Sequence, residues 1–240
     1  VVPSAAWRLV SALDSLKKPD GHVAIHGFYD AVRSLTEQEK GVLAAMPDTA
    51  EALREALGLE AFLDDLQGYA WQERLHGAPT CNICGIETGY TGPGLKTVLP
   101  ARARAKVDFR LVPDQRPQEV LSQLRTHLDR HGFYDVRIQP IEDHERAIRT
   151  PVDDPWVQAT ASVAEAFYGK PPEISINSPG TAPMDVLVDE VTGSLLFAPG
   201  GAGYEGSRIH APDEHIRLSD LTEATKMTAC LLQQFGESGS

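Results

Sequence analysis

Residues 101–112 alternate between two kinds of side chain, and this pattern limits the possible folds more than any other feature of the chain. Small or apolar residues take turns with polar ones: Ala103, Ala105, Val107, Phe109 and Leu111 against Arg102, Arg104, Lys106, Asp108 and Arg110. Side chains of a strand point alternately to its two faces, so the pattern predicts a strand with one buried and one solvated face. A second strand is expected at 80–86, joined to the first by a Gly-rich loop.

The flanking segments predict helices that cover one face of this sheet. Residues 4–16 and 117–131 carry apolar residues at helical spacing. A short strand at 23–25, further helices within 37–46 and 48–67, and another strand at 136–141 complete the first part. The order strand, strand, helix, strand favours an α+β fold with an open-faced antiparallel sheet and helices on one side, of the ferredoxin-like kind.

A domain boundary is expected near residues 146–155, where Thr150-Pro151 and Asp154-Pro155 flank a short acidic stretch. We therefore divide the chain into residues 1–148 and 149–240. The second part predicts a helix at 155–168, a strand at 173–177, a helix near 183–190, a strand at 194–198, a Gly-rich loop at 199–207 and a helix at 218–235. Alternating helices and strands indicate an α/β layer, and about 90 residues suffice only for part of such a domain.

Composition excludes several classes of protein. The net charge is −12, which argues against a broad nucleic-acid-binding face. No apolar run approaches the roughly 18 residues of a membrane span. Cys81 and Cys84 have the spacing of a redox or zinc motif, but no second pair exists, and on a strand they point to opposite faces. Small apolar residues in a sheet are the better interpretation.

Two residues are candidates for a binding or catalytic role, and each could equally be an ordinary surface residue. Arg110 ends the alternating strand, where its planar guanidinium could hold a carboxylate, although a solvated face with ion pairs would look the same. His210 lies after glycines 200, 201, 203 and 206, in a loop that follows an expected buried strand. A lone loop histidine is commonly a surface residue, and the alternative is a ligand or catalytic role.

A set of short motifs in a fixed order resembles a known family. The motifs are Asn82-Ile-Cys-Gly-Ile86, Gly89-Tyr-Thr-Gly92, Lys96-Thr-Val-Leu-Pro100, Ala105-Lys-Val-Asp-Phe-Arg-Leu-Val-Pro113, Tyr168-Gly-Lys-Pro-Pro172, Pro179-Gly-Thr-Ala-Pro183 and His210-Ala-Pro-Asp-Glu214. They are similar to the lid, or dimerisation, domain and the closing catalytic segment of the di-zinc exopeptidases, a superfamily of carnosinase-like dipeptidases, aminoacylases, succinyl-diaminopimelate desuccinylases and glutamate carboxypeptidases. The resemblance makes residues 1–148 a lid domain with a helical insert and 149–240 part of an α/β catalytic domain.

The resemblance also implies roles for individual residues. His210 matches a zinc ligand, Arg110 the lid arginine that binds the substrate carboxylate, and Thr97 a lid hydroxyl that contacts the substrate. Thr181 matches a substrate-contacting serine, whereas Asn177 stands where the dipeptidases often have arginine. The implied substrate is a dipeptide or an N-acyl amino acid, the implied cofactor a pair of divalent metal ions such as zinc, and the implied assembly a homodimer through the lid.

The resemblance is also incomplete, because the family's His-x-Asp motif, bridging Asp and Glu-Glu pair are not found in these 240 residues. We therefore expect the chain to be the carboxyl-terminal portion of a cytoplasmic zinc-dependent hydrolase, with no catalytic acid or base of its own and with little metal bound on its own. The alternative is a non-catalytic dimerisation module.

Overall fold

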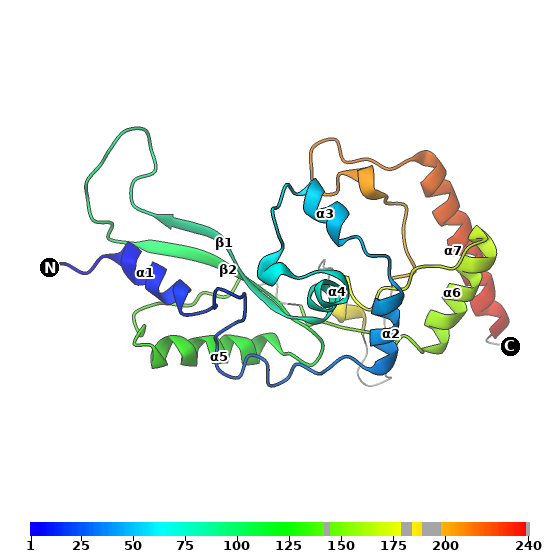
Figure 1. Cartoon of the computed structure of the whole chain (residues 1–240), viewed down its shortest axis with the longest axis horizontal. Coiled ribbons are helices and arrows are strands. Elements are labelled where there is room, and N and C mark those ends of the chain that lie inside the picture. The colour runs from blue at the N-terminus through cyan, green and yellow to red at the C-terminus, as the bar shows by residue number, and fades with distance from the viewer. Residues whose placement is uncertain (142–144, 179–183, 189–197, 239–240) are drawn as a thin grey trace. The chain divides into compact units, whose positions relative to one another are not determined.

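The computed structural model describes residues 1–141, 145–178, 184–188 and 198–238 (Figure 1). The described residues form two compact units. Unit 1 comprises residues 1–36, 47–148 and 177–187, and unit 2 comprises residues 37–46, 149–176 and 188–240, apart from the positions outside the described ranges. Each unit is described by itself below.

A long antiparallel hairpin organises unit 1, as the alternating pattern predicts. β1 (Thr80–Thr88) pairs with β2 (Ala103–Arg110), with Cys81 opposite Phe109 and Ile86 opposite Ala105. A bulge between Ile83 and Gly85 places Cys84 as an extra residue in β1. The two paired strands confirm the α+β class, and they are the whole sheet within the described ranges.

Helices α1 (Ala5–Asp14) and α5 (Pro117–Arg130) lie on the same side of this hairpin (Figure 1). Both were predicted. Their apolar faces form one core with the inner face of the strands, in which the following residues are almost fully buried: Ala12, Leu16, Val23, Ile25, Phe28, Cys81, Val120, Leu128 and Phe133. Burial raises the pKa of the Cys81 thiol to about 11. Without a bound metal, this thiol is therefore protonated at neutral pH.

Two predicted strands of unit 1 do not form. Residues 23–25 make only an isolated bridge from Val23 to Lys17, and 136–141 have no ladder. Val136 and Ile138 do pack against the core. The carbonyl of Val136 accepts a hydrogen bond from Arg125 of α5 at 2.6 Å instead of from a neighbouring strand. Apolar alternation therefore located the buried side chains correctly but not the backbone partner.

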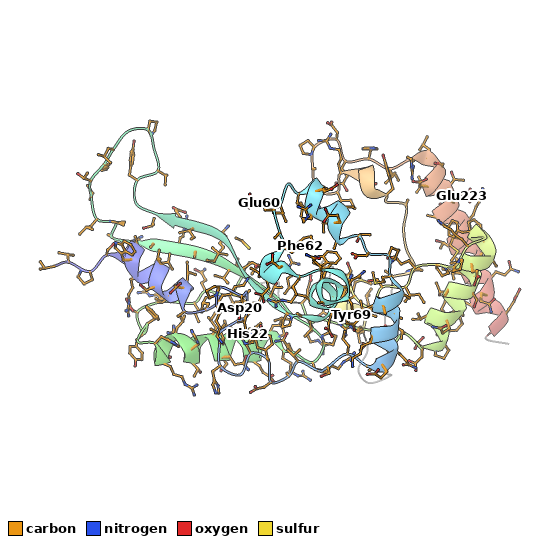
Figure 2. The ribbon with its side chains drawn as sticks, viewed as in Figure 1. Asp20, His22, Glu60, Phe62, Tyr69 and Glu223 are labelled. Atoms are coloured by element: carbon orange, nitrogen blue, oxygen red, sulfur yellow. The ribbon has the colours of Figure 1, made fainter. Side chains whose placement is uncertain are left out.

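Short helices make up the insert between residues 37 and 77. They are α2 (Glu37–Ala45), α3 (Ala50–Ala56), the 3-10 turn η1 (Leu63–Asp65) and α4 (Gly68–Gly77). The sequence predicted the first three segments but not α4. Phe62, labelled in Figure 2, packs on Trp71 of α4 with ring centroids 5.4 Å apart. This aromatic contact holds α4 beside the start of η1.

In unit 2, α6 (Pro155–Tyr168) packs against α7 (Leu218–Ser238). The rings of Trp156 and Phe235 stack with centroids 3.7 Å apart. The Asp154 carboxylate caps α6 by accepting the Trp156 N–H at 2.8 Å. Both helices were predicted from the sequence.

A buried ion pair holds α2 in unit 2. Arg149 Nη1 lies 3.2 Å from Glu39 Oε1, and both side chains are 4% exposed. Removing one member of such a pair leaves an uncompensated buried charge, which costs about 3–5 kcal/mol. The helix therefore depends on a residue 110 positions away in the sequence.

Three predictions for residues 173–198 have different outcomes. The strand at 173–177 does not form. Instead the Asn177 carbonyl accepts a hydrogen bond from His76 Nδ1 at 3.1 Å, and its side-chain amide donates to the His76 carbonyl. Within the helix expected near 183–190, the described residues contain only the 3-10 turn η2 (Asp185–Leu187). The strand expected at 194–198 lies outside the described residues except for Ala198.

Candidate functional site

The polar face of the hairpin carries Arg110, the first predicted substrate-binding residue. Arg110 is the last residue of β2 and lies opposite Thr80. Its Nε donates to Asp108 Oδ2 at 2.8 Å, and the Arg110 side chain is 48% exposed. Asn82 lies opposite Asp108 on this face. The guanidinium is thus already beside a carboxylate, and a substrate carboxylate would have to share or displace that contact.

Thr97 lies in the connection between the strands, at the other end of the hairpin. It is exposed in the loop 89–102, in which Tyr90 Oη donates to the Pro93 carbonyl at 2.9 Å. The Thr88 hydroxyl donates to the Arg102 carbonyl at 3.2 Å and closes the base of the loop. The ladder between this base and Arg110 is seven residues long, or roughly 23 Å at the rise of a strand. The structure therefore does not bring Thr97 and Arg110 together within one chain.

His210 lies in unit 2, in the loop that precedes α7. Its backbone has a φ of 62°, and its N–H donates to Glu214 Oε2 at 3.3 Å. Among the described residues, its exposed imidazole has no hydrogen-bond partner. A neutral imidazole displayed in this way is a common metal ligand, and the Glu214 carboxylate lies next to it in the loop.

These donors fit a shared metal site but not a complete one. Within the described ranges, no three His, Cys, Asp or Glu side chains lie close enough together to hold a metal ion. A tight divalent site needs about three or four protein ligands. His210 can supply one bond, and the other ligands would have to come from elsewhere.

One predicted site residue is not described by the structure, and several residues near the candidate site were not predicted. Thr181 lies outside the described residues. Asp108 at Arg110, and Tyr204, Ser207 and His215 around His210, were not singled out from the sequence. The alternation places Asp108 on the same face as Arg110, so this ion pair could have been predicted. The contacts in the loop of His210 depend on left-handed backbone conformations, which no sequence motif indicates.

The hairpin with helices α1 and α5 on one face is the part of the chain that a known family covers. The profile of the family described as "Peptidase dimerisation domain" matches residues 2–136. The chain belongs to this family, the dimerisation domain of the M20 peptidases. This agrees with the resemblance stated from the motifs.

Dipeptidases and a metallo-carboxypeptidase match 95% or more of the chain. The chain is 27% identical to the Cys-Gly metallodipeptidase of Saccharomyces cerevisiae, over 99% of this chain and 50% of that protein. It is 28% identical to the Beta-Ala-His dipeptidase of Homo sapiens, over 95% of this chain and 45% of that protein. The crystal structure of an M20 family metallo-carboxypeptidase from Sulfolobus solfataricus superimposes with a TM-score of 0.85 at 38% identity, covering 96% of this chain and 52% of that one.

The chain thus spans about half the length of the curated relatives it matches. Among the described residues, none of the helices has the length and hydropathy of a membrane span.

Proposed function

We propose that the whole protein is a metal-dependent exopeptidase or amidase that cleaves the amide bond of a dipeptide or an N-acyl amino acid. The observation that carries the proposal is the exposed His210 imidazole, which has no partner among the described residues and lies in a chain whose relatives are metallopeptidases. This relationship does not favour the alternative of a non-catalytic dimerisation module. A cytoplasmic location is part of the same proposal.

In this proposal, His210 is a ligand to one of two divalent ions, with zinc as the expected metal. When bound, such a metal pair polarises the scissile carbonyl and lowers the pKa of a water molecule. The further ligands come from residues outside this chain. The division of roles at residue 148, with a lid before it and part of the catalytic domain after it, belongs to the same proposal.

Arg110 binds the free carboxylate of the substrate through its guanidinium, and Thr97 and Thr181 donate hydroxyl hydrogen bonds to the substrate. A two-residue substrate spans at most about 7 Å, whereas the base of the loop that carries Thr97 lies roughly 23 Å from Arg110 along the strand. A substrate bound to Arg110 therefore does not reach the base of that loop in the same chain. The separation supports a homodimer in which Thr97 of one protomer serves the site that contains Arg110 of the other.

The test uses the complete gene product. Metal analysis should find divalent metal, and a screen of dipeptides and N-acyl amino acids should find hydrolysis that a chelator abolishes. His210→Ala should lose metal and activity together, whereas the isolated 240-residue chain should bind little metal because one imidazole gives weak affinity. Full metal content in His210→Ala, or metal-independent hydrolysis, would contradict the proposal.

A further inference from the structure

The loop that carries His210 is closed at its base by contacts between Tyr204, Ser207 and His215. The Tyr204 hydroxyl lies 2.7 Å from His215 Nε2, and the His215 N–H donates to the Ser207 carbonyl at 3.1 Å. Ser207 is 2% exposed, and its hydroxyl accepts the Tyr204 N–H at 2.9 Å. These contacts join the two ends of the segment 208–214, which has His210 near its middle.

The hydrogen-bond partners of His215 show which of its two ring nitrogens carries the proton. His215 Nδ1 lies 2.9 Å from the Asp213 carbonyl, which can only accept, so Nδ1 carries the proton. In the neutral imidazole, Nε2 is then the acceptor, and the Tyr204 hydroxyl donates to it. The Arg217 guanidinium lies over the Tyr204 ring, 4.1 Å from its centroid, and holds the ring from its face.

The enclosed segment needs such a closure, because its backbone is unfavourable on its own. Arg208, His210 and Asp213 have φ values of 55°, 62° and 62°, in the left-handed region, and residues 207–215 contain no glycine. Non-glycine residues keep this conformation only where the surrounding contacts over-determine it. The Arg208–Asp213 ion pair at 3.4 Å lies inside the loop, between exposed side chains, and contributes little.

We propose that Tyr204 and His215 are positioning residues, which clamp the loop 208–214 in its left-handed conformation and so set the metal affinity of His210. The inference rests on the proposed function, because it takes His210 as a ligand. Without the clamp, the loop would populate relaxed backbone conformations in which the imidazole points elsewhere. Metal binding would then have to restore the left-handed conformation, and affinity would fall.

The test measures metal affinity of the complete gene product by competition with a chelator, using Zn²⁺ alone. Tyr204→Phe keeps the ring under Arg217 but removes the hydroxyl, and the loss of one exposed hydrogen bond should weaken one metal site about three- to tenfold. His215→Ala should weaken it similarly. His215→Gln, whose side-chain amide can still accept from Tyr204, should stay nearer to wild type. Excess metal should restore the turnover of Tyr204→Phe, which a general loss of folding would not allow.

Two further variants separate the possible failures. Tyr168→Phe removes a hydroxyl from an exposed tyrosine of α6 in the same unit and should bind metal like wild type. His210→Ala should lose the affected site altogether. If His210→Ala weakens binding but Tyr204→Phe does not, the clamp is wrong and the proposed function stands; if His210→Ala binds metal like wild type, the ligand assignment and the clamp both fall.

Discussion

Arg110 forms an ion pair with Asp108 of its own strand, and this pair affects how much substrate binding should lose when Arg110 is truncated. Asp108 offsets part of the positive charge, and the guanidinium is half exposed. Truncating an arginine that holds a desolvated carboxylate costs about 2–5 kcal/mol, and we place Arg110 at the lower end of this range because water reaches it. The residue should matter most for substrates with a free carboxylate.

Arg110→Ala in the complete gene product should therefore raise KM about 30-fold, the equivalent of about 2 kcal/mol, while metal content stays the same. A substrate with an amidated carboxyl end should show no difference between variant and wild type. Arg104→Ala is the matched control, because Arg104 lies on the same strand and forms an ion pair with Glu87 of β1, with both side chains exposed. Equal increases in KM for both arginine variants would contradict the assignment.

Between α1 and α5, a buried histidine couples the packing of two elements to pH. The Ser15 hydroxyl donates to the Ala12 carbonyl at 2.7 Å, so His127 Nε2 donates to Ser15 Oγ at 3.1 Å. Burial, and to a lesser degree the nearby ring of His131, lowers the pKa of His127 below its usual 6.5. Folding therefore favours the neutral imidazole over the protonated one.

The sign of the pH dependence follows from this shift. The unfolded chain takes up the proton near pH 6.5, and the folded chain only at lower pH, so the free energy of unfolding should fall as pH drops from about 6.5 through the lowered pKa. Urea unfolding of this chain at pH 7.5 and at lower pH measures the loss. His127→Gln should be less stable at pH 7.5 by about 1–3 kcal/mol, since it disturbs a buried hydrogen bond, but its stability should depend less on pH. An unchanged pH dependence in that variant would rule out His127 as the origin.

Among the elements, the sequence predicted those whose pattern is local. The alternation at 101–112 and the helical spacing at 4–16 and 117–131 gave β2, α1 and α5 because one face of each is buried. The strands at 136–141 and 173–177 were wrong because a strand also needs a partner, and Arg125 and His76 provide hydrogen bonds there instead. The helix α4 was missed because it begins and ends at glycines, although Trp71 and Leu75 have the spacing of a helix.

The candidate site was predictable in its residue types but not in its geometry. The motifs indicated Arg110, Thr97 and His210, yet only the register of the hairpin separates Arg110 from Thr97. The contact of Tyr204 with His215 depends on three left-handed residues, and the sequence there has no glycine to suggest them.

At the scale of the whole molecule, the lid exposes apolar side chains that a second copy could cover. Trp7 and Val10 of α1 are 73% and 45% exposed, and Ile83 and Ile86 of β1 are 50% and 53% exposed. Burying such side chains contributes about 25 cal/mol per Å², and a two-fold interface is the commonest arrangement for a homodimer.

The complete gene product should therefore sediment as a dimer at micromolar concentration, and Trp7→Glu should shift it toward monomer. Leu57→Glu is the control. Leu57 follows α3 in the same unit, is 60% exposed, and belongs neither to α1 nor to the hairpin. A wild-type protein that sediments only as a monomer would contradict the dimer, and dissociation by Leu57→Glu alone would place the interface on another surface.

Two contacts join residues that are far apart in the sequence. Glu39 and Arg149 are 110 residues apart, and His76 and Asn177 are 101 residues apart. During synthesis on the ribosome, the early partner of each pair emerges long before the later one. Glu39 carries an uncompensated charge until Arg149 has left the exit tunnel, and unit 1 is incomplete until residues 177–187 follow. Neither unit can therefore finish folding before most of the chain has been made, and pauses in translation before residue 149 should prolong the exposure of an unfinished, aggregation-prone intermediate.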